Sequence, residues 1–242
     1  MAEIALQADH RPLYARVREI LVERVSSGYW KPGQSLPNEF DLADELGVSQ
    51  GTVRKALDML ASEHLLVRRQ GRGTFVAEHT SADIHFRFFH LHDAQGRPAI
   101  PDSIGTKVEV GAARPAERKA LMLDAGGNVI RIRRVRTVEG EPVIVERIVL
   151  PGDLFAGFET VDPVPNTLYD LFQSRFGVTI SGADEQLTAV AASAKEARLL
   201  KVEPGAPLLE INRTAMGVDG RRIEWRVSHC LTTRLHYFSR LR

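Results

Sequence analysis

The stretch from residue 36 to residue 57 constrains the fold most, because it has the pattern of two short helices joined by a tight turn. Asn38 can cap the first helix, and Gly47 can end it, since glycine tolerates the left-handed conformation found after many helices. Ser49 can then cap the second helix. Apolar residues at helical spacing predict the buried positions. These are Phe40, Leu42, Ala43 and Leu46 in the first helix, and Val53, Ala56, Leu57 and Leu60 in the second.

The opposite face of the second helix is small and polar at its start and basic further on. It carries Gln50, Gly51, Thr52, Arg54, Lys55 and Asp58. A helix that enters the DNA major groove needs short side chains for close approach, an amide for adenine and a guanidinium for guanine or phosphate. An ordinary helical pair with a solvated outer face fits the same pattern. The periodicity alone leaves both interpretations open.

The flanking sequence favours DNA binding. A third helix is predicted before the pair, from Arg11 to about Gly28. Two short β runs are predicted after the pair, at 65–67 and 74–76. Between these runs lies Arg68-Arg69-Gln70-Gly71-Arg72-Gly73, a basic hairpin tip. Such a tip alone fits a solvated loop, but directly after a recognition helix it indicates a wing whose arginines meet phosphates or a narrow minor groove. Three helices followed by this hairpin describe a winged helix-turn-helix.

Composition narrows the remaining possibilities. The chain of 242 residues has room for one or two domains, and its net charge of +1 requires any nucleic-acid site to be a local cluster of basic residues. The single cysteine, Cys230, excludes an intrachain disulfide and a structural thiolate metal site. The sequence has no signal-peptide pattern and no apolar run that could span a bilayer, so the expected compartment is the cytoplasm.

The most informative part of the second half is 129–150, which reads as a β-hairpin turning at 139–141. If Val138 pairs with Pro142, Arg134 lies opposite Glu146, and Arg136 shares their otherwise apolar face. Buried charges are costly unless they are paired or bind a ligand. One interpretation is a structural Arg134–Glu146 pair, which leaves Arg136 without an obvious partner. The other is a pocket in which the arginines bind an anionic group.

The other elements of this half follow from local signals. Helices are predicted over 115–123 and 166–177, and strands over 106–110 and 179–190, with a possible bulge at Gly182. A capping box at 193–196 opens a short helix. Asp219-Gly220 is a strong two-residue turn between strands at 208–218 and 221–231.

Residues 12–77 resemble the DNA-binding domain of the GntR superfamily of bacterial transcription regulators, and the wing resembles its HutC-like branch. The matching pieces are Pro12-Leu13-Tyr14, Gly28, Pro32-Gly33, Leu36-Pro37-x-Glu39, Leu42-Ala43, Gly47-Val48-Ser49, Thr52-Val53-Arg54-x-Ala56-Leu57, Leu60 and Gly71-x-Gly73-Thr74-Phe75-Val76. The resemblance implies that Ser49, Gln50, Thr52, Arg54 and Gly71 lie at the DNA. The basic character of the helix face and of the wing adds Lys55, Arg69 and Arg72.

Departures from the family pattern bear on recognition. Gln50 and Phe40 stand where relatives often carry arginine, so we expect Arg54 and the wing to contribute more of the recognition. The operator is correspondingly expected to differ from the GT…AC palindrome usual in the family.

Most of residues 84–240 resemble the UTRA effector-binding domain. The matching pieces are Arg134-x-Arg136, Gly140-x-Pro142, Glu146, Leu150-Pro151, Thr167-Leu168-Tyr169, Ala197-x-x-Leu200, Asp219-Gly220 and Glu224. The resemblance implies a chorismate-lyase-like antiparallel sheet flanked by helices. It also implies a ligand pocket lined by Arg134, Arg136, Glu146, Thr167, Tyr169, Glu224 and Tyr237.

The prediction is an α+β chain with a winged helix-turn-helix domain at 1–77, a linker at 78–83 and an effector-binding and dimerisation domain at 84–242. The hypothesis is a regulator, not an enzyme, that binds a palindromic operator in double-stranded DNA as a homodimer. A small anionic effector, a phosphosugar or carboxylate, releases this repressor, and no cofactor, metal or membrane is expected.

Two alternatives stay open. His90 and His92, with His85 and Asp93 nearby, could form a metal site in a metal-responsive regulator. An enzyme with a DNA-binding appendage is the more distant alternative, because no nucleophile–base pair or phosphate-binding loop stands out and fold similarity alone does not establish function.

Overall fold

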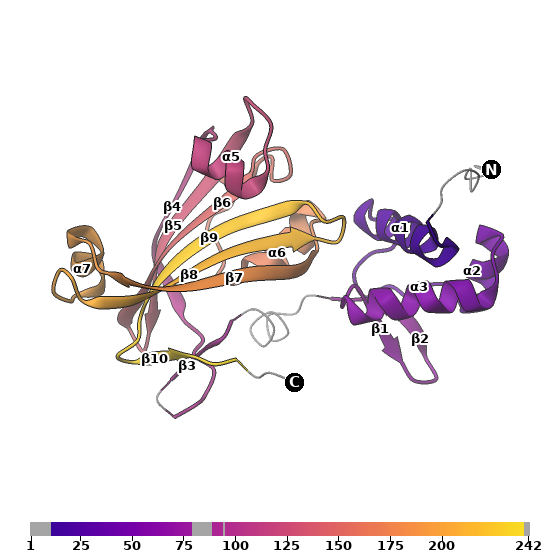
Figure 1. Cartoon of the computed structure of the whole chain (residues 1–242), viewed down its shortest axis with the longest axis horizontal. Coiled ribbons are helices and arrows are strands. Elements are labelled where there is room, and N and C mark those ends of the chain that lie inside the picture. Colours follow the sequence, from indigo (N-terminus) through magenta and orange to yellow (C-terminus); the bar gives the residue numbers. More distant parts are fainter. Residues whose placement is uncertain (1–10, 79–88, 94, 240–242) are drawn as a thin grey trace. The chain divides into compact units, whose positions relative to one another are not determined.

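The computed structural model describes residues 11–78, 89–93 and 95–239, and the chain divides into two compact units, Met1–Glu78 and His79–Arg242 (Figure 1). Apart from Glu78, the predicted linker lies outside the described residues, and so does His85. None of the described helices is long and apolar enough to cross a membrane.

The first unit has three helices followed by an antiparallel hairpin. The elements are α1 (Leu13–Ser26), α2 (Glu39–Leu46), α3 (Gln50–Ser62), β1 (Leu66–Arg69) and β2 (Gly73–Val76). The hairpin register runs from Leu66 opposite Val76 to Arg69 opposite Gly73. The predicted winged helix-turn-helix is therefore confirmed.

Local capping explains where the two central helices begin and end. The Asn38 side chain accepts hydrogen bonds from the backbone N–H groups of Phe40 and Asp41 at 3.0 Å each. Gly47 has a φ of 63°, the left-handed conformation predicted for the end of α2. The Ser49 hydroxyl accepts from the Thr52 N–H at 3.2 Å and so caps α3.

The buried positions agree with the predicted stripes except at one residue. Leu42, Ala43 and Leu46 of α2 are buried, as are Val53, Ala56, Leu57 and Leu60 of α3. The prediction that Phe40 is buried is wrong, since it is 66% exposed. Phe40 precedes Leu42 by two residues, which is more than half a turn of helix, so its side chain points away from the core.

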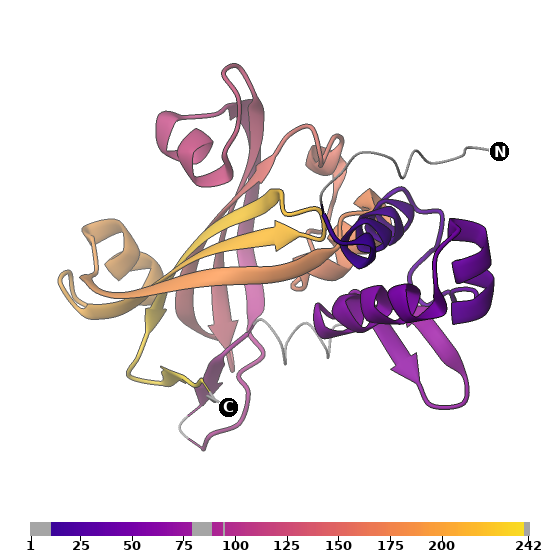
Figure 2. The ribbon, with the colours of Figure 1, turned by 45° about the vertical axis from the view of Figure 1, so that its right-hand side comes forward.

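The second unit is built on a six-stranded antiparallel sheet in the order β4-β5-β6-β9-β8-β7. The strands are β4 (Asp102–Ala112), β5 (Asn128–Val138), β6 (Glu141–Pro151), β7 (Ile180–Ala191), β8 (Pro207–Gly217) and β9 (Arg222–Leu231). Figures 1 and 2 show the strong twist of this sheet. Its helices are α5 (Pro115–Leu121), α6 (Leu168–Phe176), α7 (Ala194–Leu200) and the short 3-10 helix η1 (Phe158–Thr160). The predicted α+β class is confirmed.

The two faces of the sheet have different coverings. On the face that carries Ile132 and Ile148, α6 and η1 contribute Phe172 and Phe158 to one apolar core. A two-stranded ribbon of β3 (Leu91–Asp93) and β10 (Leu235–Tyr237) packs on another part of that face. The opposite face packs against α5 and α7. Between α6 and the ribbon, this first face of the sheet carries charged side chains of the hairpin formed by β5 and β6.

The hairpin register places these charges. Arg134 pairs with Glu146, as predicted. The predicted pairing of Val138 with Pro142 is wrong: a bulge between Arg136 and Thr137 shifts the register, so Val138 pairs with Glu141. The predicted bulge near Gly182 and the capping box at Ser193 are both present.

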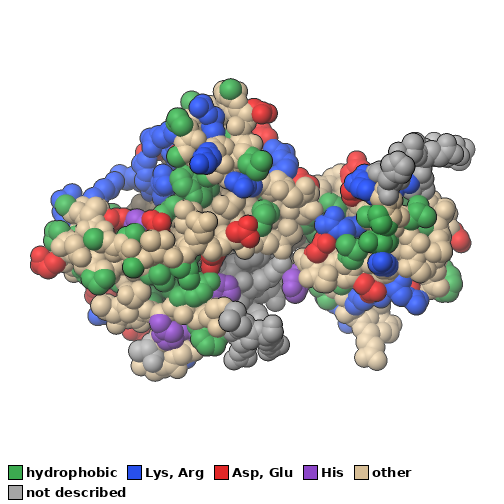
Figure 3. Space-filling model, viewed as in Figure 1, with side chains coloured by type: hydrophobic (Ala, Val, Ile, Leu, Met, Phe, Trp, Pro, Cys, Tyr) green, Lys and Arg blue, Asp and Glu red, His purple; other side chains and the backbone are tan. Residues whose placement is uncertain are grey.

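The small net charge hides an uneven distribution. Figure 3 shows Lys and Arg side chains gathered over α5 and the strands beside it, whereas opposite charges are interspersed on the visible face of the first unit. On that face of the first unit, basic side chains therefore lie close to acidic ones.

Candidate nucleic-acid interface and effector site

The predicted DNA-binding residues of α3 lie around its first two turns. Gly51, Arg54 and Lys55 are exposed, whereas Gln50 and Thr52 are half-buried. Thr52 Oγ1 lies 2.9 Å from the Ser49 hydroxyl. The first turn of α3 therefore presents small polar groups, and the guanidinium of Arg54 follows one turn later.

The wing and the recognition helix are joined by side chains. Arg68, in the first strand of the wing, donates to the backbone carbonyl of Arg54 at 3.4 Å. Gly71 adopts a φ of 68° in the turn between β1 and β2, a conformation that glycine accepts without strain. Arg72 beside it is exposed. The structure thus brings the basic hairpin next to the exposed face of α3.

Two of the predicted cations are held by aromatic rings. The Lys55 ammonium lies 3.7 Å from the centre of the Tyr14 ring of α1, and the Arg69 guanidinium lies 4.7 Å from that of Phe75. Both side chains remain exposed overall. These contacts fix the direction of each cation at an energetic gain of about 0.5–1 kcal/mol.

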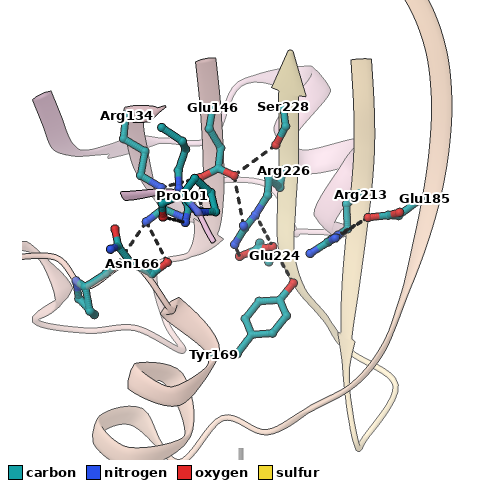
Figure 4. A network of polar contacts seen from close by, with 12 residues as sticks. Pro101, Arg134, Glu146, Asn166, Tyr169, Glu185, Arg213, Glu224, Arg226 and Ser228 are labelled. Atoms are coloured by element: carbon teal, nitrogen blue, oxygen red, sulfur yellow. Dashed lines mark hydrogen bonds and ion pairs between the residues drawn. The ribbon is translucent and has the colours of Figure 1, made fainter. Parts of the chain in front are cut away.

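In the second unit, buried and half-buried polar side chains form a network across the sheet (Figure 4). Its members, here called the polar network, are Arg134, Arg136, Glu146, Tyr169, Glu185, Arg213, Glu224, Arg226, Ser228 and Tyr237. Six of these ten were predicted to line the effector pocket: Arg134, Arg136, Glu146, Tyr169, Glu224 and Tyr237. We expect Thr167, which lies immediately before α6, to be near the network, because the Asn166 carbonyl next to it accepts from Arg134 at 3.4 Å.

Arg134 and Arg136 approach the same carboxylate from β5. Arg134 Nε donates to Glu146 Oε2 at 2.5 Å, and Arg136 Nη1 lies 3.9 Å from the same oxygen. Arg136 also donates to the Pro101 carbonyl at 2.7 Å. The structural Arg134–Glu146 pair is therefore formed, and Arg136 has a backbone partner that the hairpin pattern did not indicate.

The middle of the network comes from β9 and α6. Arg226 donates to Glu224 through two nitrogens, at 2.7 and 3.0 Å, and to Glu146 at 3.2 Å. The Tyr169 hydroxyl donates to Glu224 at 2.9 Å. Arg226 thus links the Arg134–Glu146 pair to the predicted residues Tyr169 and Glu224.

Tyr237 contacts a different part of the network. Its hydroxyl donates to Glu185 at 2.5 Å, and Glu185 also accepts from Arg213 Nε at 2.6 Å. The ribbon is thereby joined to the far strands β7 and β8. Sequence reasoning missed Arg213, Arg226 and Glu185. The sequence did contain a signal for two of them. If the strands on either side of the Asp219-Gly220 turn are paired outward from that turn, Arg213 lies opposite Arg226, as it does in the structure.

The network is charged although it is buried. Burial alone would raise the pKa of Glu146, but Arg134, Arg226 and Arg136 lower it strongly, so the carboxylate stays ionised. Burial lowers the pKa of Arg136 to about 10, against the opposing effect of Glu146. Arg136 therefore keeps its positive charge near neutral pH.

Three buried donors near the Arg134–Glu146 pair have no hydrogen-bond partner among the described residues. They are Arg134 Nη2, Arg136 Nε and the hydroxyl of Ser103. Ser103 on β4 pairs directly with Arg136 on β5, so these groups belong to one part of the sheet. Buried polar groups without partners are rare and costly. Such a group of donors, two of them on cations, suits an anion with several acceptor oxygens.

A small cavity adjoins the network. It has a volume of about 20 Å³, room for about one water molecule. Glu146, Arg226, Tyr237 and Leu91 are among the residues that line it, and so is His90, which immediately precedes β3. A larger, open hollow of about 550 Å³ lies beside Arg97, Glu139 and Arg234. None of the ten network residues lines that hollow, whereas Glu146, Arg213, Arg226, Ser228 and Tyr237 line the smaller cavity. We therefore assign the candidate effector site to the polar network, which includes this cavity and, outside its lining, the unpaired donors of Arg134 and Arg136.

The histidines of the metal alternative contact aromatic rings. The ring centres of His90 and Tyr237 are 5.4 Å apart, and those of His92 and Phe238 are 4.9 Å apart. Burial lowers the pKa of His90, although Glu185 opposes this effect. Within the described part of the chain, no three His, Cys, Asp or Glu side chains could hold one metal ion. The described residues therefore give the metal alternative no support.

A DNA-reading winged helix followed by a sheet domain with a buried ionic network defines a class: transcription regulators that respond to a ligand. Family models give the same division. Residues 13–76 match "Bacterial regulatory proteins, gntR family" and residues 100–236 match "UTRA domain". The chain belongs to the GntR family of bacterial regulatory proteins, in the branch that carries a UTRA domain. The predicted family is confirmed, and with it the prediction that the chain is a DNA-binding regulator and not an enzyme.

Individual relatives agree. The chain is 30% identical over 236 residues to the "HTH-type transcriptional repressor NagR" of Bacillus subtilis, covering 95% of this chain and 96% of NagR. It is 28% identical over 229 residues, 93% of each chain, to the "Probable fructoselysine utilization operon transcriptional repressor" of Escherichia coli.

Solved structures give the same result. The ligand-binding domain of a GntR-family regulator from Bordetella bronchiseptica matches with a TM-score of 0.60 and 36% identity, over 64% of this chain and 98% of that one. PhnF from Mycobacterium smegmatis matches with a TM-score of 0.56 and 26% identity, over 93% and 99%.

Proposed function

We propose that this regulator is a repressor that binds a palindromic operator as a homodimer and leaves it when a small anionic effector binds at the polar network. Two relatives are named as repressors, which supports the sign of regulation. A dimer with twofold symmetry matches a palindrome, because each protomer reads one half-site with the same residues.

The observation that carries the effector proposal is the group of buried donors on Ser103, Arg134 and Arg136. A phosphate or carboxylate bound there accepts from all three at once and removes the cost of leaving them unpaired. Arginine suits this role because its planar guanidinium can donate two parallel hydrogen bonds. One relative is named for fructoselysine utilization, which puts sugar-derived compounds among the first effectors to test.

The effector acts by binding one conformation of the protein more tightly than the other, since a ligand that binds both equally shifts no equilibrium. The cavity beside the network has a volume of only about 20 Å³, and the ribbon residues Leu91 and Tyr237 help to line it. A phosphosugar is far larger than a water molecule. Effector binding therefore requires the ribbon to move, and this movement distinguishes the two states.

The DNA-binding assignment is tested with Arg54→Ala. We expect this variant to bind the tightest duplex that the wild-type protein selects from a randomised pool about tenfold more weakly, the size of one base contact. Its melting temperature should stay close to wild type, because Arg54 is exposed. Unchanged affinity at physiological salt would contradict the role of α3.

The effector assignment is tested with Arg136→Gln, using Arg133→Gln as the matched control. Arg133 lies on the same strand, but it pairs with Glu109 at an exposed position. Phosphosugars and small carboxylates are screened for release of the selected duplex and for a rise in melting temperature. A compound that acts on wild type and on Arg133→Gln should lose both effects on Arg136→Gln. A normal response in Arg136→Gln would show that the anion binds elsewhere.

A further inference from the structure

The carboxylate of Glu39, at the first position of α2, lies among the side chains assigned to DNA recognition. Its Oε2 atom accepts from Arg54 Nε at 2.8 Å and lies 2.8 Å from Arg54 Nη2. The same oxygen accepts from the Gln50 amide at 3.2 Å. Its Oε1 atom accepts from Arg68 at 3.2 Å. One side chain therefore contacts two residues of the recognition helix and the first strand of the wing.

The acid is the inner partner in this cluster and the arginines are the outer ones. The Glu39 side chain is 17% exposed, whereas those of Arg54 and Arg68 are 56% and 38% exposed. Glu39 occupies one edge of the Arg54 guanidinium, and a guanidinium has five N–H donors in total. The remaining donors stay available to a base. The contact thus orients Arg54 without covering it.

Arg68 extends the same contact to the wing. Besides Glu39, it binds Asp58 on α3 at 2.8 Å and the backbone carbonyl of Arg54 at 3.4 Å. The wing is otherwise a short hairpin of four residues per strand. Glu39 and Arg68 therefore fix the wing against the recognition helix.

We infer that Glu39 is a positioning and specificity-determining residue of the DNA-binding unit, which holds Arg54 and Arg68 in the arrangement that reads the operator. This inference rests on the proposed binding of DNA by α3 and the wing. Two physical effects support it. An arginine that is already ordered loses less rotamer freedom when it docks on a base. Two acids and two arginines also make the cluster formally neutral, which weakens attraction to phosphates of any sequence and so favours the correct site.

The charge state needed for this role is present in the folded protein. The hydrogen bond from Arg54 lowers the pKa of Glu39. The carboxylate is therefore ionised throughout the neutral range, and Glu39→Gln removes a full negative charge with little change in size.

The test compares Glu39→Gln with the wild type on two duplexes: the one that the wild type selects from a randomised pool, and a shuffled duplex of the same composition. Glu45→Gln is the matched control, because Glu45 also lies on α2 and binds an arginine, Arg24, at 2.6 Å, away from α3 and the wing. Melting temperatures are measured for every variant and should change little, since the glutamine side chain keeps an oxygen that accepts hydrogen bonds from the arginines.

We expect Glu39→Gln to bind the selected duplex roughly five- to tenfold more weakly, comparable to the loss of one base contact. Its affinity for the shuffled duplex should be unchanged or higher. The slope of log K against log salt concentration for that duplex should steepen by up to about one unit per freed arginine. Glu45→Gln should retain the wild-type affinities and slope.

A double-mutant comparison separates this inference from the proposed function. In an Arg54→Ala background, Glu39→Gln should weaken binding to the selected duplex by at most about twofold, because Glu39 then has no Arg54 side chain to orient. If Arg54→Ala weakens binding and Glu39→Gln leaves the ratio of the two affinities unchanged, the inference is wrong while the recognition helix stands. A parallel loss on both duplexes together with a lower melting temperature would also overturn it. If Arg54→Ala changes nothing, the assignment of the recognition helix itself is wrong.

Discussion

At the scale of single residues, His229 lies between two carboxylates that belong to different elements. Its Nδ1 contacts Glu196 of α7, and its Nε2 lies 2.9 Å from Glu210 of β8. Burial alone would lower the pKa of His229, but hydrogen bonds to Glu210 and Glu196 outweigh that effect and raise it. The imidazolium form therefore fastens α7 to the sheet.

The raised pKa gives this contact a defined pH dependence. Its stabilising effect is complete below the unfolded histidine pKa of about 6.5 and is lost as pH rises through the higher folded value. His229→Gln should therefore lower the melting temperature more at pH 6 than at pH 9. The difference should reach at most ~4 °C, for a contribution of about 1 kcal/mol or less. Equal losses at both pH values, measured by thermal unfolding, would contradict the assignment.

Residue-level prediction succeeded where a single hairpin contained the information. Arg134 and Glu146 face each other because both lie close to one turn. The hairpin pattern left Arg136 without an obvious partner, and in the structure Arg136 donates to the Pro101 carbonyl, which is distant in sequence. Phe40 was grouped with the apolar positions of the first helix, although its angular position on α2 places it outside the buried stripe.

At the scale of elements, the ribbon of β3 and β10 covers part of the polar network. Its hold on the sheet includes the hydrogen bond from the Tyr237 hydroxyl to Glu185 at 2.5 Å. Leu91 and Leu235 add apolar contacts to the core beneath. The Tyr237–Glu185 hydrogen bond connects the ribbon to β7, and its removal should loosen the ribbon selectively.

Tyr237→Phe tests this role. A hydrogen bond to a charged group contributes about 1.5–3 kcal/mol, so amides of residues 91–93 and 235–237 should exchange with deuterium roughly tenfold or more faster. The exchange of β5 and β6 should remain as in wild type. Arg234→Gln, in the exposed turn before β10, is the control. Unaltered exchange in the ribbon of Tyr237→Phe would show that the apolar contacts alone hold it.

At the scale of the whole molecule, the two units differ in how far the sequence predicted them. The first unit follows from local signals such as the caps at Asn38 and Ser49, so its element order and its turns were predicted correctly. In the second unit the hairpins were predicted, but the strand order β4-β5-β6-β9-β8-β7 was not. That order depends on pairings such as Ile144 with Cys230, which join segments far apart in the chain and leave no local pattern.

The pairing of β3 with β10 also sets an order of events during synthesis. The first unit lies within residues 1–78, so a ribosome has delivered all of it early. Strand β3, at residues 91–93, has to wait for residues 235–237 before it can pair. Each newly made chain can therefore complete its first unit before the ribbon that covers part of the polar network is able to form.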